Sequence, residues 1–348
     1  MKQLTIGKNE DGKRVDAIAA LVLPKAGKGF IYKMLRKKNI VLNGKKAEGN
    51  DRVSEGDVVT FFLSDETIRG FSETGAEAGQ TQEELTDRAK SQSTEADKGK
   101  EAARSKEIRA FSDAIIYEDE DVILINKPAG MLSQKAVQED VSTNELLIAY
   151  LLDRGRITEE ELKTFRPSVC NRLDRNTSGI LCAGVSLKGL RELTALIRER
   201  RVDKYYMCIV KGVPAGKTDR YTHLVSYLSK DGKSNKVEVR NREFEGSEKV
   251  EIEYMPVRSE GGYTLMRVKL ITGKSHQIRA QLASIGHPIA GDPKYGDRKE
   301  CERLKKQHGV KRQLLSAVCM SFPEDTRLEP LKGRKFSIVL PKDFFICG

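Results

Sequence analysis

Residues 65–110 place the strongest limit on how this chain of 348 residues can fold. The segment consists largely of Glu, Lys, Gln, Ser, Thr, Ala and Gly and contains very few large apolar side chains. Such a segment cannot bury enough apolar surface to offset the conformational entropy that folding removes. We therefore predict a mobile, partly helical linker over residues 65–110, with one folded domain before it and another after it.

The first predicted domain, residues 1–64, has the pattern of a small α/β unit. Helical patterns cover residues 12–23 and 28–38, and strand patterns cover residues 40–45 and 56–62. The pair Asn43-Gly44 favours a tight turn after the first of these strands. Basic side chains gather near one end of the unit: Arg36, Lys37, Lys38, Lys45 and Lys46.

The second predicted domain, residues 111–348, is dominated by strand patterns. These patterns cover residues 114–117, 122–127, 180–183, 204–211 and 268–271. Helical patterns follow the capping box at residues 142–145 and cover residues 187–200 and 275–285. Strands and helices do not alternate regularly, so we predict an α+β fold with a mixed, mostly antiparallel sheet.

Charge and composition restrict the partners and cofactors of this chain. Its formal net charge of +11 suits a polyanion, either nucleic acid or an acidic membrane face, although solubility alone is also consistent. The six cysteines form no Cys-x-x-Cys pair and only four histidines are present, so no zinc site is expected. No apolar segment resembles a signal peptide or approaches the ~20 residues that span a bilayer. We therefore expect a cytoplasmic protein that binds no metal and no membrane.

Two segments resemble phosphate-binding loops but lack the required spacing. Gly273-Lys274-Ser275 would need a glycine at position 268, and Gly216-Lys217-Thr218 would need one at position 211. No Gly-x-Ser-x-Gly elbow is present either. The sequence therefore does not indicate nucleoside triphosphate hydrolysis or a serine nucleophile.

The stretch Asn171–Gly179 contains the strongest candidate for chemistry, since Asp174 lies there between Arg172 and Arg175. Positive charge nearby favours an ionised carboxylate, which can act as a nucleophile or a base. Arg279 lies on a predicted helix after a Gly-Lys-Ser turn and could reach this carboxylate. Tyr206, on the buried face of a predicted strand, could stack on a base. From chemistry alone two interpretations stay open: a catalytic carboxylate, or an Asp174 that only caps and forms salt bridges beside a core tyrosine.

Four motifs resemble those of the RluA-type pseudouridine synthases, and they occur in that family's order. Residues 171–179 resemble the signature His-Arg-Leu-Asp-x-x-Thr-Ser-Gly. The other three motifs lie at residues 118–130, at residues 204–206, and at residues 272–279 with 286–296. In addition, residues 1–64 are similar to an S4-like RNA-binding domain, the small module first described in a small-subunit ribosomal protein.

This resemblance implies a pseudouridine synthase fold around a catalytic cleft, which isomerises uridine to pseudouridine in RNA without a cofactor or metal. Asp174 would attack the sugar or base, or remove a sugar proton. Arg172 would fill the space that the flipped uridine leaves, and Tyr206 would stack on the flipped base and assist proton transfer. Arg279 would pair with Asp174. The resemblance also assigns Leu173 and Ile278 as walls of the pocket. In the first domain it assigns basic residues that would face RNA: Arg36, Lys37, Lys38 and Lys45.

The chain departs from the family pattern at three positions. Asn171 replaces the usual His, Lys274 the usual Arg, and Gln281 a frequent His. An asparagine can still form hydrogen bonds in place of an imidazole. We expect a monomeric pseudouridine synthase that acts on large-subunit (23S) ribosomal RNA. The alternatives are a transfer RNA enzyme and a non-catalytic RNA-binding ribosome-assembly factor on the same fold.

Overall fold

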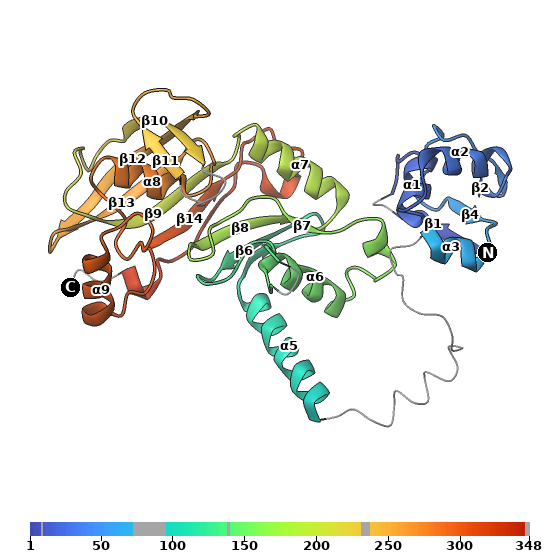
Figure 1. Ribbon diagram of the computed structural model, residues 1–348, viewed down its shortest axis with the longest axis horizontal. Helices are drawn as coiled ribbons and strands as arrows, with labels where there is room; N and C mark the ends of the chain where they lie inside the picture. The colour runs from blue at the N-terminus through green and yellow to red at the C-terminus, as the bar shows by residue number, and fades with distance from the viewer. Residues whose placement is uncertain (8–9, 72–94, 138–139, 231–236, 345–348) are drawn as a thin grey trace. The chain divides into compact units, whose positions relative to one another are not determined.

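The computed structural model describes residues 1–7, 10–71, 95–137, 140–230 and 237–344 (Figure 1). The centre of the predicted linker, residues 72–94, lies outside the described residues. The chain forms two compact units. The first contains residues 1–112, 147–167 and 186–188, and the second contains residues 113–146, 168–185 and 189 onward. The predicted domain boundaries near residues 64 and 110 stay a prediction.

Within the first unit, residues 1–64 form a four-stranded antiparallel sheet in the order β1-β4-β2-β3 with two helices. These elements are β1 (Lys2–Thr5), α1 (Val15–Val22), α2 (Lys28–Arg36), β2 (Ile40–Leu42), β3 (Lys45–Lys46) and β4 (Val58–Phe61). Asn43 and Gly44 join β2 to β3 with φ values of 49° and 72°, as the tight turn requires. The sequence predicted both helices but missed the four-residue strand β1.

Part of the segment predicted as a linker is folded. Helix α3 (Asp65–Phe71) buries Ile68 in the same apolar core as Ile31 of α2. Helix α5 (Glu95–Asp113) carries Phe111, which is buried against the ring of Tyr150 at 5.5 Å between centroids. Ile68 thus packs the start of the segment into the core of the first unit, and Phe111 lies one residue past its predicted end.

The second unit is built on one large sheet. Eleven strands form it in the described part of the chain, in the order β11-β10-β12-β13-β9-β14-β8-β6-β5, with β15 beside β14 and β7 beside β8. They are β5 (Ile115–Glu118), β6 (Val122–Lys127), β7 (Ser168–Val169), β8 (Ser178–Gly184), β9 (Asp203–Lys211), β10 (Thr222–Lys230), β11 (Val237–Arg240), β12 (Glu248–Glu260), β13 (Tyr263–Leu270), β14 (Leu315–Ser321) and β15 (Lys335–Ser337). The pair β14–β8 is parallel and the other described pairs are antiparallel. The predicted α+β class with a mixed, mostly antiparallel sheet is therefore confirmed.

Four longer helices and three short 3-10 turns complete the described elements. They are α6 (Thr143–Asp153), α7 (Leu187–Arg198), α8 (Gln277–Ser284), α9 (Arg298–His308), η1 (Glu161–Lys163), η2 (Glu329–Leu331) and η3 (Lys342–Phe344). Leu193 of α7 packs in the core with Ile180 of β8. Ala280 of α8 packs with Val250 of β12, which fixes this short helix against the sheet (Figure 1). These two contacts hold the elements that border the site.

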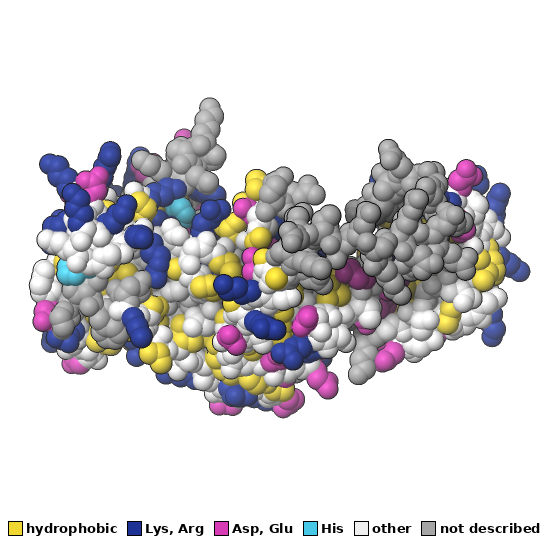
Figure 2. All heavy atoms as spheres, turned by 90° about the horizontal axis from the view of Figure 1, so that it is seen from below, with side chains coloured by type: hydrophobic (Ala, Val, Ile, Leu, Met, Phe, Trp, Pro, Cys, Tyr) yellow, Lys and Arg dark blue, Asp and Glu magenta, His cyan; other side chains and the backbone are white. Residues whose placement is uncertain are grey.

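Lysine and arginine side chains project at the end of the second unit that carries β10 to β13 and α9, at the left of Figure 2. Within the described residues, no helix combines the length and apolarity that a bilayer crossing would need.

Candidate active site

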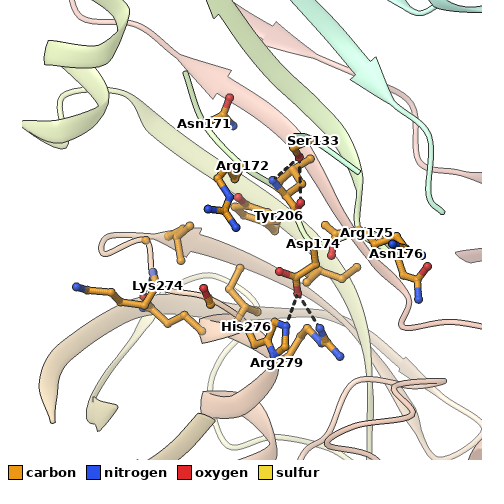
Figure 3. Close-up of a pocket in the computed structure, with 18 of the residues that line it drawn as sticks. Ser133, Asn171, Arg172, Asp174, Arg175, Asn176, Tyr206, Lys274, His276 and Arg279 are labelled. Atoms are coloured by element: carbon orange, nitrogen blue, oxygen red, sulfur yellow. Dashed lines mark hydrogen bonds and ion pairs between the residues drawn. The ribbon is translucent and has the colours of Figure 1, made fainter. Parts of the chain in front are cut away.

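A cavity of about 770 Å³ opens in the second unit (Figure 3). Its walls come from the loop before β8, from β9, from the turn before α8 and from residues 293–294. Seven of the lining side chains are lysine or arginine, and Asp174 is the one carboxylate among the described residues that line it. The cavity therefore presents a single acid in a basic environment, which suits an anionic ligand.

The loop that carries Asp174 is held by its neighbours on both sides. The Leu173 backbone N–H donates to the Ser133 hydroxyl at 3.0 Å, and that hydroxyl donates to the Leu173 carbonyl at 3.0 Å. The Thr177 N–H donates to the Asp174 carbonyl at 3.0 Å and closes a turn. Gly179 follows with φ of 116°, and a Cβ there would lie 2.2 Å from the Ala317 carbonyl oxygen. Only glycine lets β8 approach β14 so closely.

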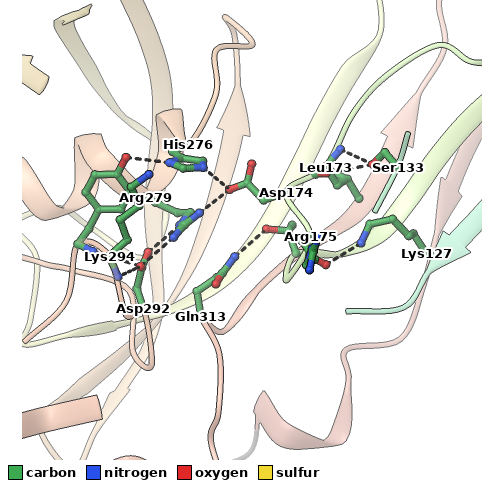
Figure 4. A network of polar contacts seen from close by, with 12 residues as sticks. Lys127, Ser133, Leu173, Asp174, Arg175, His276, Arg279, Asp292, Lys294 and Gln313 are labelled. Atoms are coloured by element: carbon green, nitrogen blue, oxygen red, sulfur yellow. Dashed lines mark hydrogen bonds and ion pairs between the residues drawn. The ribbon is translucent and has the colours of Figure 1, made fainter. Parts of the chain in front are cut away.

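Lys127 anchors the next part of the loop and lies to the right of Arg175 in Figure 4. Its side chain is fully buried, and Nζ donates to the carbonyls of Pro128, Met131 and Arg175 at 2.9, 2.8 and 3.2 Å. Burial lowers the pKa of Lys127 to about 8. The three carbonyls compensate for the lost hydration of the ammonium, so this lysine ties the loop after β6 to the Asp174 loop.

Arg279 of α8 joins two carboxylates (Figure 4). Nη1 donates to Asp174 Oδ2 at 2.7 Å. Along another edge of the guanidinium, Nε donates to Asp292 Oδ2 at 2.7 Å and Nη2 donates to Asp292 Oδ1 at 2.9 Å. Asp292 is completely buried, while the Asp174 side chain is 25% exposed. Burial opposes the charge of Arg279, but hydrogen bonds to Asp292 and Asp174 raise its pKa above the ordinary value. The predicted contact between Asp174 and Arg279 is therefore present.

His276 supports this arrangement from the turn before α8. Its backbone is left-handed, with φ of 57°, and its Nδ1 lies 2.9 Å from the Tyr295 hydroxyl. Nε2 is 4.0 Å from Asp174 Oδ2. Burial lowers the pKa of His276, which favours the neutral ring at neutral pH. The Tyr295 ring also lies 5.2 Å from the Arg279 guanidinium carbon, so His276 and Tyr295 together brace the arginine.

Tyr206 enters the cavity from β9, between the neighbouring strands β13 and β14. Its side chain is 5% exposed. Burial, and then the charge of Asp174, raise the pKa of Tyr206, so its hydroxyl keeps its proton at neutral pH. Tyr205 lies on the opposite face of β9, as predicted, where Arg267 stacks on its ring at 4.8 Å. The structure thus brings Asp174, Tyr206 and Arg279 to one cavity.

The other predicted site residues divide between the two units. Leu173 and Ile278 are buried and line the cavity, and Arg172 lines it with an exposed side chain. The predicted RNA-facing residues of the first unit are all exposed and are not among those that line the cavity: Arg36, Lys37, Lys38 and Lys45.

Asn171 holds the start of the loop although it departs from the family pattern. Its Oδ1 accepts a hydrogen bond from the Cys182 N–H at 2.8 Å, and its Nδ2 donates to the Ile180 carbonyl at 3.5 Å. The side chain therefore points to β8 and away from Asp174 (Figure 3). Gln281 is also buried, where it donates to the Ser226 hydroxyl at 3.2 Å.

Sequence reasoning assigned no role to three residues of this site: Lys127, Ser133 and Asp292. Lys127 and Asp292 lie inside motifs that carry the resemblance, which is the signal that could have drawn attention to them. Ser133 lies outside the motifs, and nothing in its local sequence indicates a contact with residue 173. In the described residues, no three His, Cys, Asp or Glu side chains lie together as metal ligands would.

Known RNA pseudouridine synthases resemble this chain in sequence and in fold. Residues 121–284 match the family model described as RNA pseudouridylate synthase. An uncharacterized RNA pseudouridine synthase of Chlorobaculum parvum is 34% identical over 241 residues, which cover 66% of this chain and 71% of that protein. Ribosomal large subunit pseudouridine synthase C of Salmonella typhimurium is 28% identical over 346 residues, with 99% and 93% covered. The solved structure of human RNA pseudouridylate synthase domain containing 4 superposes with a TM-score of 0.55 at 21% identity, covering 70% of this chain and 94% of that one, and so confirms the predicted fold.

Proposed function

Because the chain belongs to the RNA pseudouridylate synthase family, we propose that it converts specific uridines of large-subunit ribosomal RNA to pseudouridine, as a cytoplasmic monomer without metal or cofactor. The observation that carries the proposal is the Asp174 carboxylate, which lines a basic cavity and contacts Arg279 at 2.7 Å. A relative that covers nearly the whole chain is named for the large ribosomal subunit, which supports this substrate.

The first unit supports an RNA partner as well. Residues 1–64 hold a small antiparallel sheet and two helices, and this supports the proposal that they form an S4-like RNA-binding domain. The exposed basic residues Arg36, Lys37, Lys38 and Lys45 would contact phosphates around the target. In this proposal the first unit contributes affinity and site choice, and the cavity of the second unit performs the reaction.

Asp174 would perform the central step on a uridine that has left the RNA stack. The isomerisation breaks the bond from C1′ to N1, forms one from C1′ to C5, and moves a proton from C5 to N1. Since Oδ2 contacts Arg279, Oδ1 is the oxygen available to the cavity (Figure 3). It would attack the sugar or the base, or remove a sugar proton, and the released uracil would turn before it reattaches through carbon.

The other side chains would prepare and complete this step. Arg279 stabilises the carboxylate in its reactive position. Tyr206, whose hydroxyl stays protonated, would stack on the uracil ring and assist proton transfer. The exposed Arg172 would occupy the space in the RNA stack, while Leu173 and Ile278 shape the apolar wall.

The test compares the wild type, Asp174→Asn and the matched surface variant Asp219→Asn on transcribed large-subunit ribosomal RNA. We expect the wild type and Asp219→Asn to form pseudouridine at the same positions. Asp174→Asn should form none, while its RNA affinity stays within about twofold of wild type because it loses no phosphate contact. Product in transfer RNA alone would refute the proposed substrate. A wild type that modifies no cellular RNA would favour the assembly factor.

A further inference from the structure

Lys204 is a buried cation that the reaction described above does not use. It lies on β9 two residues before Tyr206, so both side chains are on the same face of the strand, about 6.6 Å apart along it. Its side chain is 8% exposed, and it lines the same cavity. Leu270 of β13 is its register partner and also lines the cavity, so Lys204 occupies the region next to Tyr206.

No carboxylate of the described chain contacts this ammonium directly, although the nearby charge of Asp203 favours it weakly. Among the described residues, Lys204 Nζ forms no hydrogen bond and no ion pair. Asp203 is adjacent in sequence, but it lies on the opposite face of β9 and pairs with Lys269 at 2.9 Å. The acid of the cavity, Asp174, is engaged by Arg279. A buried charge without a partner is costly to the folded protein, so its presence indicates a ligand that supplies the opposite charge.

The groups around Lys204 favour an anion. Burial lowers the pKa of Lys204, and the charge of Arg200 adds to this, while Cys182 and then Asp203 act in the opposite direction. Arg200 belongs to the basic segment 198–201 at the end of α7, and Ile197 of the same helix lines the cavity. This end of α7 therefore brings exposed positive charge close to the buried lysine. The cavity volume of about 770 Å³ is in the range that accepts ligands much larger than one pyrimidine ring.

We propose that Lys204 forms a phosphate subsite, which binds the backbone phosphate of the nucleotide that adjoins the target uridine. This inference rests on the proposed function. In RNA, each base is accompanied by a phosphate, and a base held at Tyr206 brings the neighbouring phosphate toward Lys204. The ammonium then pairs with a full negative charge inside the cavity. Lys204 thus positions the target and takes no part in the bond changes.

The experiment measures RNA binding by Lys204→Met, with Lys211→Met as the matched control at the exposed end of the same strand. The probe is a transcribed fragment of large-subunit ribosomal RNA, and the dissociation constant is measured over a series of KCl concentrations. For Lys204→Met we expect affinity about tenfold weaker and a log–log salt slope that is smaller by about 0.7 to 0.9, as loss of one phosphate contact requires. Lys211→Met should keep the wild-type slope.

Two further measurements separate this role from a structural one. The free Lys204→Met protein should unfold at a higher temperature than wild type, because it no longer buries an uncompensated charge. In steady state it should raise KM and leave kcat unchanged. A wild-type salt slope in Lys204→Met, a lowered unfolding temperature, or a lowered kcat at unchanged KM would each overturn the inference. If the wild type shows the Lys204-dependent slope but forms no pseudouridine, the proposed function fails and the phosphate subsite stands.

Discussion

Two carboxylates contact Arg279, and we expect Asp292 to matter mainly for the stability of the fold and Asp174 mainly for activity. Asp292→Asn replaces a completely buried carboxylate that contacts the guanidinium at 2.7 and 2.9 Å and accepts the Lys294 N–H at 2.9 Å. An asparagine presents an NH2 group to one of the arginine N–H groups, so a donor faces a donor. Removing one partner of a buried ion pair costs about 3–5 kcal/mol. This is a large fraction of the roughly 5–15 kcal/mol that stabilises a typical folded protein.

Asp174→Asn should behave differently, although it touches the same arginine. The Asp174 side chain is 25% exposed, and Arg279 keeps both contacts to Asp292 when the Asp174 charge is removed. The expected cost is therefore about 1 kcal/mol, the value of one hydrogen bond. Pseudouridine formation should nevertheless be abolished.

The assay is urea unfolding followed by far-ultraviolet circular dichroism, since the chain contains no tryptophan for fluorescence. Pseudouridine formation is measured on the same preparations. The exposed variant Asp219→Asn serves as the control and should match the wild type in both assays. Equal destabilisation by Asp174→Asn and Asp292→Asn would refute the reasoning, as would a cost below about 1 kcal/mol for Asp292→Asn.

Ser133→Ala removes the hydroxyl that both accepts from and donates to the Leu173 backbone, so it should cost about 2 kcal/mol and lower kcat more than it raises KM. Denaturation and steady-state kinetics measure this; a kcat equal to that of Ser229→Ala, a serine substitution on β10, would contradict it. Burial holds the pKa of Lys127 at about 8 against 10.5 in the unfolded chain. Between these pH values the unfolded chain binds more protons, so unfolding free energy should rise with pH, by about 3 kcal/mol in total. The test measures the free energy of unfolding of the wild type and of Lys127→Met at pH 7.5 and at pH 10. If the difference in this free energy between the two proteins is the same at both pH values, the prediction is wrong.

The contact between Asp174 and Arg279 was predictable because the two residues lie in recognisable motifs. A carboxylate between arginines, and an arginine at the start of a distant helix, predicted the contact of Asp174 with Arg279, which is 2.7 Å long. The alternation along β9 predicted that Tyr206 is buried and that Tyr205 faces the other way, since successive residues of a strand point to opposite faces.

The supports of this pair were not predictable from local sequence. Ser133 contacts Leu173 across forty residues of chain, and only the folded sheet brings the two together. From its sequence, Lys127 is expected to be the exposed polar end of a strand. In the structure its ammonium is buried and donates hydrogen bonds to three backbone carbonyls. Helix α9 was also missed, although Asp297 caps its start and Gly309 ends it with φ of 68°. Its mostly charged sequence offers little apolar periodicity, so the capping signals at its two ends were the usable evidence.

The departure at position 171 shows which part of the signature the loop depends on. The backbone of β8 presents the Cys182 N–H and the Ile180 carbonyl toward the start of the loop, and Asn171 satisfies both at 2.8 and 3.5 Å. An amide carries an acceptor and a donor on one planar group, so it can serve both backbone groups at once. At this position Asn171 therefore acts through hydrogen bonds to the β8 backbone, and its amide carries no group that titrates. Since Asn171 points away from Asp174, this substitution changes how the loop is anchored and leaves the acid, its arginine and the tyrosine in contact with the cavity.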